Sequence, residues 1–426
     1  MRYRIGIVVL AVILSARMVL AEDMPKLIFS FESWTIQTAW NGDASRIIAC
    51  TYDPKLFATN PTQYYVTVYD AGTGQALFST PSSYPYPGSS FPCFVQSADQ
   101  NLFLNMFENH VQLWDVNSGK MVFDLDHTAK VMMAWWSTDE SRILALTADG
   151  QMNLWDMSSG QRLQTRDSEL VFVPSSFDRQ WFINGNALVV WGLNDNHVAV
   201  WDVMTGERLR QWVVTPPDGL VFYSASVSAD GRRALFGFYI GTAMPSLFPA
   251  RVMDVTTGEA LFDFDQPSPV TSAIWIGGSH RFITQTAGGG TSDLWDADTG
   301  KRLSRLEMQY GPGFKSIWSP DGSQLAAGAQ DLRVWKADGT LVLNLPFEHH
   351  ELTGIVGGQW SADGRRMLLV TGTRVRVIDI PSGKETKIVD GVDGSLYQGG
   401  VWSKDNRRIL AWSGAHIDIW DTPQAD

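Results

Sequence analysis

Hydrophobic and polar positions alternate in a pattern that recurs along the whole chain. The stretch Val198–Glu207 shows it clearly, because the apolar run Val-Ala-Val-Trp is followed by Asp202, a Thr-Gly pair and the start of another strand. Short apolar runs bounded by turn residues predict β-strands, and Asp and Thr-Gly are typical of the tight turns between them. The pattern therefore predicts successive short strands joined by turns.

Nine stretches align on this aspartate, at steps of 40 to 52 residues. The aligned position is occupied by Asp70, Asp115, Asp156, Asp202, Asp254, Asp296, Lys336, Asp379 and Asp421. A period near forty residues with Trp-Asp at the end of a strand is typical of a β-propeller blade.

A second motif precedes each copy, in its fullest form Trp360-Ser-Ala-Asp-Gly-Arg365. Asp-Gly between two apolar runs is a strong hairpin signal. Each unit therefore supplies strands a, b, c and d, with the Asp-Gly turn between a and b. We expect an all-β fold, a single propeller of nine four-stranded antiparallel blades. Eight blades are the alternative if the weak fourth unit, Ser176 to Trp201, folds irregularly.

The two ends of the chain predict how the ring closes. Residues 26–32 resemble a strand d without its own blade, and the C-terminus stops at a strand c, Ile417–Trp420. Pairing these segments would complete the ninth blade and leave no free sheet edge at the seam. Residues 22–426 are thus expected to form one domain.

The repeated Trp-Asp and Thr/Ser-Gly motifs, from about residue 26 to 420, resemble those of WD-repeat propellers. The Trp-Ser-Pro-Asp-Gly form at Trp318 also resembles bacterial Tol-type propellers, and several turns are similar to those of quinoproteins. One departure from the WD-repeat pattern is the missing Gly-His pair before strand a, where only His127 and His350 are near. The resemblance implies the fold; propellers host many unrelated activities.

Residues 1–21 form a basic start, a short apolar run and a small-residue end at Ala21, as in a secretory signal peptide. A membrane anchor is the alternative, although the apolar run is short for a bilayer span. We expect a periplasmic or secreted bacterial protein without a further membrane span. Removing these residues lowers the net charge from −12 to −15, which disfavours binding to nucleic acid.

The only two cysteines are Cys50, late in strand b of the first unit, and Cys93, at strand a of the second. Both should lie near one face of adjacent blades, in an oxidising compartment. The sequence makes a disulfide possible, and two buried thiols are the alternative. Such a bond would contribute roughly 4 kcal/mol by closing its loop.

Two long segments rich in proline and aromatic residues flank this position, at residues 52–65 and 81–92. In the predicted blades both would lie on the upper face, which carries the b–c loops and d–a links. Long loops on a rigid scaffold often carry binding residues. The predicted partner-binding residues are Tyr64, Tyr65, Tyr84, Tyr86 and Phe91. The alternative is that these aromatic side chains only pack over the junction of the first two blades.

No catalytic residue is predicted. The chain has neither a Gly-x-Ser-x-Gly elbow nor a phosphate-binding loop, and the repeated aspartates are expected to form turns. No metal or cofactor is expected. The sequence favours a monomeric protein-interaction scaffold that acts through its upper-face loops. The alternatives are a hydrolase or quinoprotein-like oxidoreductase with its site at the channel mouth, and a ligand or glycan sensor.

Overall fold

The structure is a computed structural model of the chain. It describes residues 26–32, 35–52, 63–83, 92–168, 179–192, 196–215, 220–228, 230–239, 248–276, 280–286, 291–307, 317–327, 331–346, 355–372, 374–390 and 396–422. Within these ranges the chain forms strands and turns without helices, as the sequence predicts.

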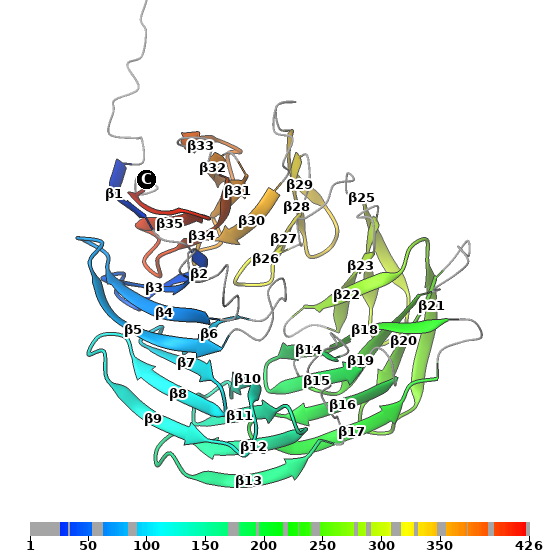
Figure 1. The fold of residues 1–426 in the computed structure, drawn as a ribbon. Coiled ribbons are helices and arrows are strands. Elements are labelled where there is room, and N and C mark those ends of the chain that lie inside the picture. Colours follow the sequence, from blue (N-terminus) through cyan, green and yellow to red (C-terminus); the bar gives the residue numbers. More distant parts are fainter. Residues whose placement is uncertain are drawn as a thin grey trace, which may run out of the picture.

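Nine four-stranded antiparallel sheets form a propeller, in which strand a of each blade lies innermost and strand d outermost (Figure 1). The first three blades comprise β2 (Thr35–Trp40), β3 (Arg46–Thr51), β4 (Gln63–Asp70) and β5 (Ala76–Ser83); β6 (Phe94–Gln96), β7 (Leu102–Phe107), β8 (His110–Asp115) and β9 (Met121–Asp126); and β10 (Val131–Trp136), β11 (Arg142–Thr147), β12 (Gln151–Asp156) and β13 (Arg162–Asp167).

The next three blades comprise β14 (Arg179–Asn184), β15 (Ala187–Gly192), β16 (His197–Asp202) and β17 (Glu207–Val213); β18 (Val221–Val227), β19 (Arg233–Tyr239), β20 (Phe248–Asp254) and β21 (Ala260–Gln266); and β22 (Val270–Trp275), β23 (Arg281–Thr286), β24 (Thr291–Asp296) and β25 (Arg302–Glu307). The fourth unit is therefore a regular four-stranded blade, which decides for nine blades over eight.

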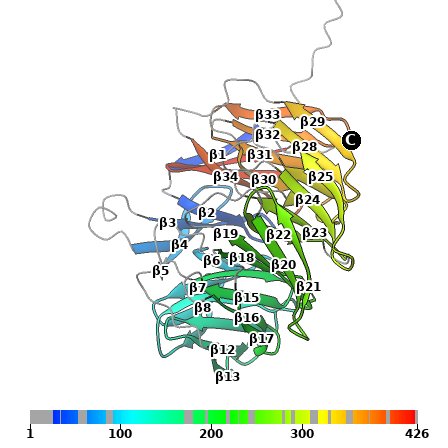
Figure 2. The same ribbon diagram turned by 90° about the vertical axis from the view of Figure 1, so that its right-hand side faces the viewer.

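The last three blades comprise β26 (Ile317–Trp318), β27 (Gln324–Ala327), β28 (Asp331–Lys336) and β29 (Leu341–Pro346); β30 (Ile355–Trp360), β31 (Arg366–Thr371), β32 (Arg374–Asp379) and β33 (Glu385–Asp390); and β34 (Tyr397–Trp402), β35 (Arg408–Ser413) and β36 (His416–Asp421) with β1 (Lys26–Glu32). β1 pairs antiparallel with β36, from Lys26 opposite Asp421 to Glu32 opposite His416. Both ribbon views place β1 beside the last strands of the chain, so the predicted closure is confirmed (Figures 1 and 2).

Tryptophans at the end of strand a link the blades around the ring. In four blades the indole N–H donates to a main-chain carbonyl of strand a in the preceding blade: Trp40 to Val401 (3.4 Å), Trp136 to Val95 (3.4 Å), Trp360 to Ile317 (3.0 Å) and Trp402 to Gln359 (3.3 Å). The first of these bonds crosses the seam between the ninth and first blades. A buried indole N–H needs such an acceptor, so tryptophan at this position also joins neighbouring blades.

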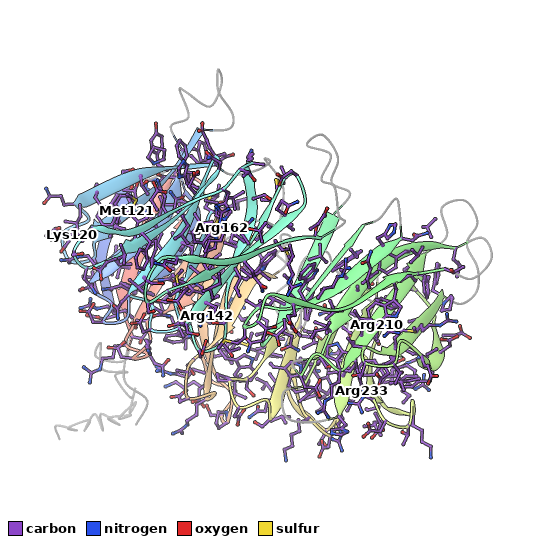
Figure 3. All side chains as sticks on the ribbon, turned by 90° about the horizontal axis from the view of Figure 1, so that it is seen from below. Lys120, Met121, Arg142, Arg162, Arg210 and Arg233 are labelled. Carbon is purple, nitrogen blue, oxygen red and sulfur yellow. A yellow bond between two sulfur atoms is a disulfide. The ribbon has the colours of Figure 1, made fainter. Side chains whose placement is uncertain are left out.

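The c–d turns pack closely on the preceding blade, which explains their glycines. Gly160 has φ +67°, and a Cβ there would lie 2.5 Å from Cδ1 of Phe123 on β9. The guanidinium of Arg210 on β17 donates to the carbonyl oxygen of Thr257 in the next blade's turn at 2.7 Å. Side chains thus fill the space between neighbouring ribbons (Figure 3, where Arg210 is labelled).

The buried apolar core lies mainly between the blades. One cluster joins Trp40 and Ile47 of the first blade to Leu410 and Ile417 of the ninth. Each sheet contributes buried side chains to clusters on both of its faces, as stacked sheets do when neighbouring sheets provide the cover. The face that carries the d–a links and b–c loops is called the upper face, and the face that carries the a–b and c–d turns is called the lower face.

Candidate functional site

The candidate partner site lies at the upper junction of the first two blades. Residues 53–62 and 84–91 of its two long segments lie outside the described residues, and with them the predicted binding residues Tyr84, Tyr86 and Phe91. The structure describes the base from which these segments leave: the upper ends of β3 and β4, the end of β5 and the start of β6.

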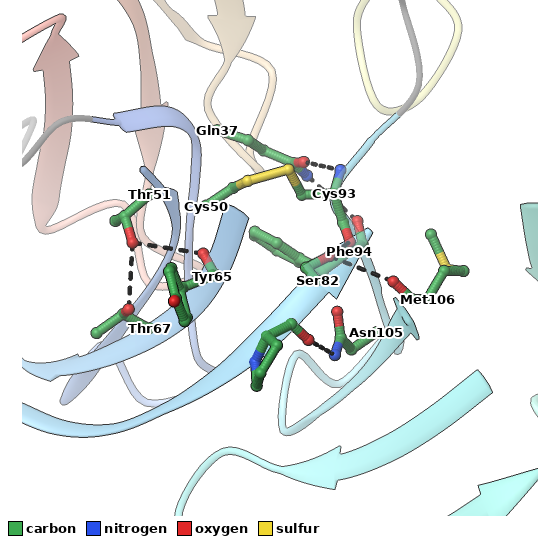
Figure 4. The surroundings of a disulfide bond; sticks show 11 residues. Gln37, Cys50, Thr51, Tyr65, Thr67, Ser82, Cys93, Phe94, Asn105 and Met106 are labelled. Atoms are coloured by element: carbon green, nitrogen blue, oxygen red, sulfur yellow. Dashed lines mark hydrogen bonds between the residues drawn. A yellow bond between two sulfur atoms is a disulfide. The ribbon is translucent and has the colours of Figure 1, made fainter. Parts of the chain in front are cut away.

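A disulfide joins the two blades at this base (Figure 4). Cys50 lies near the end of β3 and Cys93 directly precedes β6, with their Cα atoms 6.0 Å apart. Both residues are buried among the apolar side chains of the junction. The sequence placed the two cysteines on adjacent blades, and antiparallel pairing of strands a and b brings both to the upper end.

Polar side chains add further links across the junction. The amide group of Gln37 on β2 accepts from the main-chain N–H of Cys93 at 2.8 Å and donates to the carbonyl of Phe94 at 3.3 Å. The amide N–H of Asn105 on β7 donates to the carbonyl of Pro81 on β5 at 2.8 Å. These bonds and the disulfide hold the anchors of both long segments in one arrangement (Figure 4).

The two predicted tyrosines of β4 differ in environment. Tyr64 is only 3% exposed and packs with Cys50, Cys93 and Phe94. Successive strand residues point to opposite faces of a sheet, so Tyr65 lies on the other side and is half-buried. The structure therefore gives Tyr64 a packing role, and burial is the reason that it does not fit the predicted contact with a partner.

The repeated aspartates act as turn formers. One carboxylate oxygen of Asp156 accepts from the main-chain N–H groups of Ser158 and Ser159, both at 3.0 Å, while the other pairs with Arg142 of β11. The hydroxyls of Ser158 and Ser159 are the main cause that lowers the pKa of Asp156 to about 2. The Asp156 carboxylate stays ionised and bonded, which suits a structural role.

Two acids at the same position of strand c, three residues before the aligned aspartate of the sixth and ninth blades, are also bonded. Asp293 on β24 is fully buried and accepts two hydrogen bonds from the guanidinium of Arg305, at 3.0 and 3.2 Å. Asp418 on β36 accepts from the hydroxyl of Tyr397 at 2.8 Å, and both side chains are buried. Burial and the negative Asp418 raise the pKa of the Tyr397 hydroxyl. These contacts stabilise the blades.

The histidines that the structure describes do not gather into one site. His110, His197 and His416 are each the first residue of a strand c, and Nδ1 of His110 lies 2.9 Å from Asp124. His350 lies outside the described residues. Across the described ranges, no group of three or more His, Cys, Asp or Glu side chains could hold a metal ion.

His127 is buried between the second and third blades. Its Nε2 accepts from the indole N–H of Trp155 at 3.1 Å, so Nδ1 carries the proton that it donates to the carbonyl of Leu125 at 2.8 Å. Burial lowers the pKa of this imidazole to about 4. The neutral ring therefore joins strand c of the third blade to the d–a link that precedes this blade. It does so although the Gly-His pair typical of WD repeats is missing from this chain.

Comparisons with known proteins agree with this architecture, although no protein-family model matches the chain. Autophagy-related protein 16 of Arabidopsis thaliana is 22% identical over 282 residues, which cover 66% of this chain and 53% of that protein. WD repeat-containing protein slp1 of Schizosaccharomyces pombe is 29% identical over 134 residues, which cover 29% of this chain and 26% of that protein. The matched regions thus span about half and a quarter of these relatives.

Among solved structures, the C-terminal WD40 domain of Sif2 superimposes with a TM-score of 0.50 at 15% identity, covering 94% of this chain and 99% of that one. Fold and motifs together define a repeat β-propeller. The chain folds as a nine-bladed β-propeller whose repeats are similar to those of WD-repeat proteins. Propellers of this kind typically act as protein-interaction scaffolds. No helix within the described ranges is long and apolar enough to cross a membrane.

Proposed function

We propose that this protein is exported and acts as a protein-interaction scaffold, with its partner docking on the upper face of the first two blades. The observation that carries the proposal is that a disulfide and several hydrogen bonds join the strands from which the two long aromatic segments leave. A rigid base lowers the conformational entropy that a partner must otherwise remove on binding. The proposed contacts are Tyr65, Tyr84, Tyr86 and Phe91.

The composition of these segments supports protein recognition. Tyrosine combines a large rigid ring with a hydroxyl, and aromatic residues are enriched at protein interfaces. Three of the proposed contacts, Tyr84, Tyr86 and Phe91, lie within a stretch of eight residues that also contains two prolines. Proline restricts the backbone and reduces the entropy that the segment loses when it binds.

Two features support export. Residues 1–21 have the order of a signal peptide, and the cysteine pair suits an oxidising compartment. The test is the mass of the protein isolated from fractions of its native host, with thiols labelled in one sample before reduction and in another after it. A chain that begins at Glu22 and takes label only after reduction is the expected form. A cytosolic chain that retains residues 1–21 would contradict export.

The docking site is tested by crosslinking and pull-down with Tyr84→Ala and Tyr86→Ala combined. A matched control combines Val356→Ala and Leu396→Ala, which remove exposed apolar side chains at the upper ends of the eighth and ninth blades. We expect a discrete protein partner to be lost from the tyrosine variant and kept by the control, at equal melting temperatures. Retained capture by the tyrosine variant, or a lower melting temperature as its only effect, would reject this docking site.

A further inference from the structure

Two neighbouring a–b turns on the lower face carry an excess of positive charge. They are residues 361–366, Ser-Ala-Asp-Gly-Arg-Arg, and residues 403–408, Ser-Lys-Asp-Asn-Arg-Arg. Together they contain five cations and two aspartates, in a chain whose net charge is −12. We call the exposed cations of these turns, Arg365, Lys404 and Arg407, the basic patch.

Of the other two arginines, Arg366 is buried and Arg408 is partly exposed, and both are bonded to neighbouring blades. Arg366 is 7% exposed, and its guanidinium lies 4.8 Å from the ring centroid of Trp402 in the ninth blade. Arg408 donates to the carbonyl of Ala44 in the first blade at 3.1 Å and lies 3.4 Å from Asp421. These two arginines therefore fix the turns to their neighbours, while the side chains of the basic patch are exposed.

The two turns are also joined to each other. The side-chain oxygen of Asn406 accepts from the main-chain N–H of Ala362 at 2.8 Å, and its main-chain carbonyl accepts from Arg366 at 3.1 Å. Asn406 has φ +59°, a left-handed conformation that asparagine tolerates better than most residues. These bonds fix the position of Arg365 relative to Arg407, so the patch is pre-organised.

The nearby aspartates are bonded within their own turns. Asp363 accepts from the hydroxyl of Ser361 at 2.5 Å and from the main-chain N–H of Arg365 at 3.0 Å. Asp405 has the same two bonds in its turn, at 2.6 and 3.0 Å. Within the described part of the chain, no member of the basic patch forms an ion pair of its own. Lys404 acts electrostatically on Asp99, and Arg365 and Arg407 act on the aspartates of their own turns, so the three cations are exposed but partly balanced.

We propose that the basic patch binds an acidic segment of a protein partner, on the face opposite the aromatic segments. Charge complementarity requires a negatively charged ligand. The ligand must also be short, because the chain has a net charge of −12 and the rest of its surface repels anions. At physiological salt, charges act over about 8 Å, so a short acidic peptide meets mainly the patch. A nucleic acid or an anionic membrane would extend over the acidic remainder of the surface and be repelled.

The test measures binding of a short fluorescein-labelled glutamate-rich peptide by anisotropy, over a range of salt concentrations. The variant Arg365→Glu with Arg407→Glu should weaken binding about tenfold, as expected for two exposed ion pairs turned into repulsion. Arg365→Lys with Arg407→Lys should bind as the natural chain does, because the charge is kept. The control Arg232→Glu changes the equivalent exposed arginine of the fifth blade and should alter binding by about twofold at most.

Three results would overturn the proposal. The first is equal affinity of the natural chain and the charge-reversed variant at matched melting temperatures. The second is equal loss of affinity in Arg232→Glu, which would indicate a general effect of net charge. The third is stronger binding to phosphatidylglycerol vesicles or to a DNA oligonucleotide than to the peptide. None of these results bears on the upper-face site, which is tested with separate variants.

Discussion

The substitution Gly160→Ala tests how the c–d turns hold neighbouring blades together. The backbone at Gly160 has φ +67°, where an alanine costs about 1–2 kcal/mol because its Cβ crowds the following carbonyl. The new Cβ would also lie 2.5 Å from Cδ1 and 2.7 Å from Cε1 of Phe123 in the preceding blade. Relieving such an overlap in a packed region costs about 1–3 kcal/mol more. We expect a total destabilisation of about 2–5 kcal/mol.

A matched control separates the two contributions. Gly322 has φ +68°, but the nearest atom to its added Cβ is 4.0 Å away, on Ile276. Gly322→Ala should therefore show only the backbone cost of about 1–2 kcal/mol. Urea unfolding followed by tryptophan fluorescence measures both variants. Equal midpoints for Gly160→Ala and Gly322→Ala would refute the argument that contact with Phe123, in addition to backbone conformation, requires glycine in this turn.

Three further predictions concern single sites. Gln100→Gly should raise the free energy of unfolding by about 1 kcal/mol, because the backbone at Gln100 has φ +65° and the side-chain Oε1 is buried without a hydrogen bond. An unchanged or lower urea midpoint would contradict this. Cys50→Ala with Cys93→Ala should cost up to about 4 kcal/mol and make unfolding insensitive to reductant; the same sensitivity in both chains would argue against the disulfide. Because burial lowers the pKa of His127 to about 4, the unfolded chain binds more protons between that value and 6.5, so stability falls as the pH falls through this window. In His127→Gln the pH dependence of the melting temperature should be flatter, and an unchanged profile would reject the role of this imidazole.

The local pattern was sufficient to predict the blades because each turn is a short-range structure. Asp156 bonds the main chain two and three residues on, so its spacing from Gly160 is visible in the sequence alone. The same holds for the Asp-Gly turns between strands a and b. Nine in-phase copies then specify nine blades, and the fourth, with its weak upstream motif, follows the pattern because its strands still pair in the same order.

The candidate site could be predicted only in part. Proline and aromatic content marked the two long segments, and strand order placed Cys50 and Cys93 together. The different environments of Tyr64 and Tyr65 depend on which face of β4 meets the second blade, and both faces of a propeller blade are covered by apolar neighbours. The alternation of side chains therefore does not reveal which tyrosine is buried.

The fold class and the nine-unit repeat could be deduced from the sequence because each unit is built from contacts between residues close in the chain. The structure then decided for nine blades over eight and confirmed the closure, in which β1 pairs with β36 at the other end of the chain. Tertiary structure decided how the blades meet. Trp40 finds its acceptor 361 positions away, and Phe123 of one blade explains the glycine of the next. Likewise Arg366 turns inward onto Trp402 while the adjacent Arg365 faces solvent. Neighbouring residues of the same type acquire different roles because packing between blades, which no local pattern encodes, decides which of them is buried.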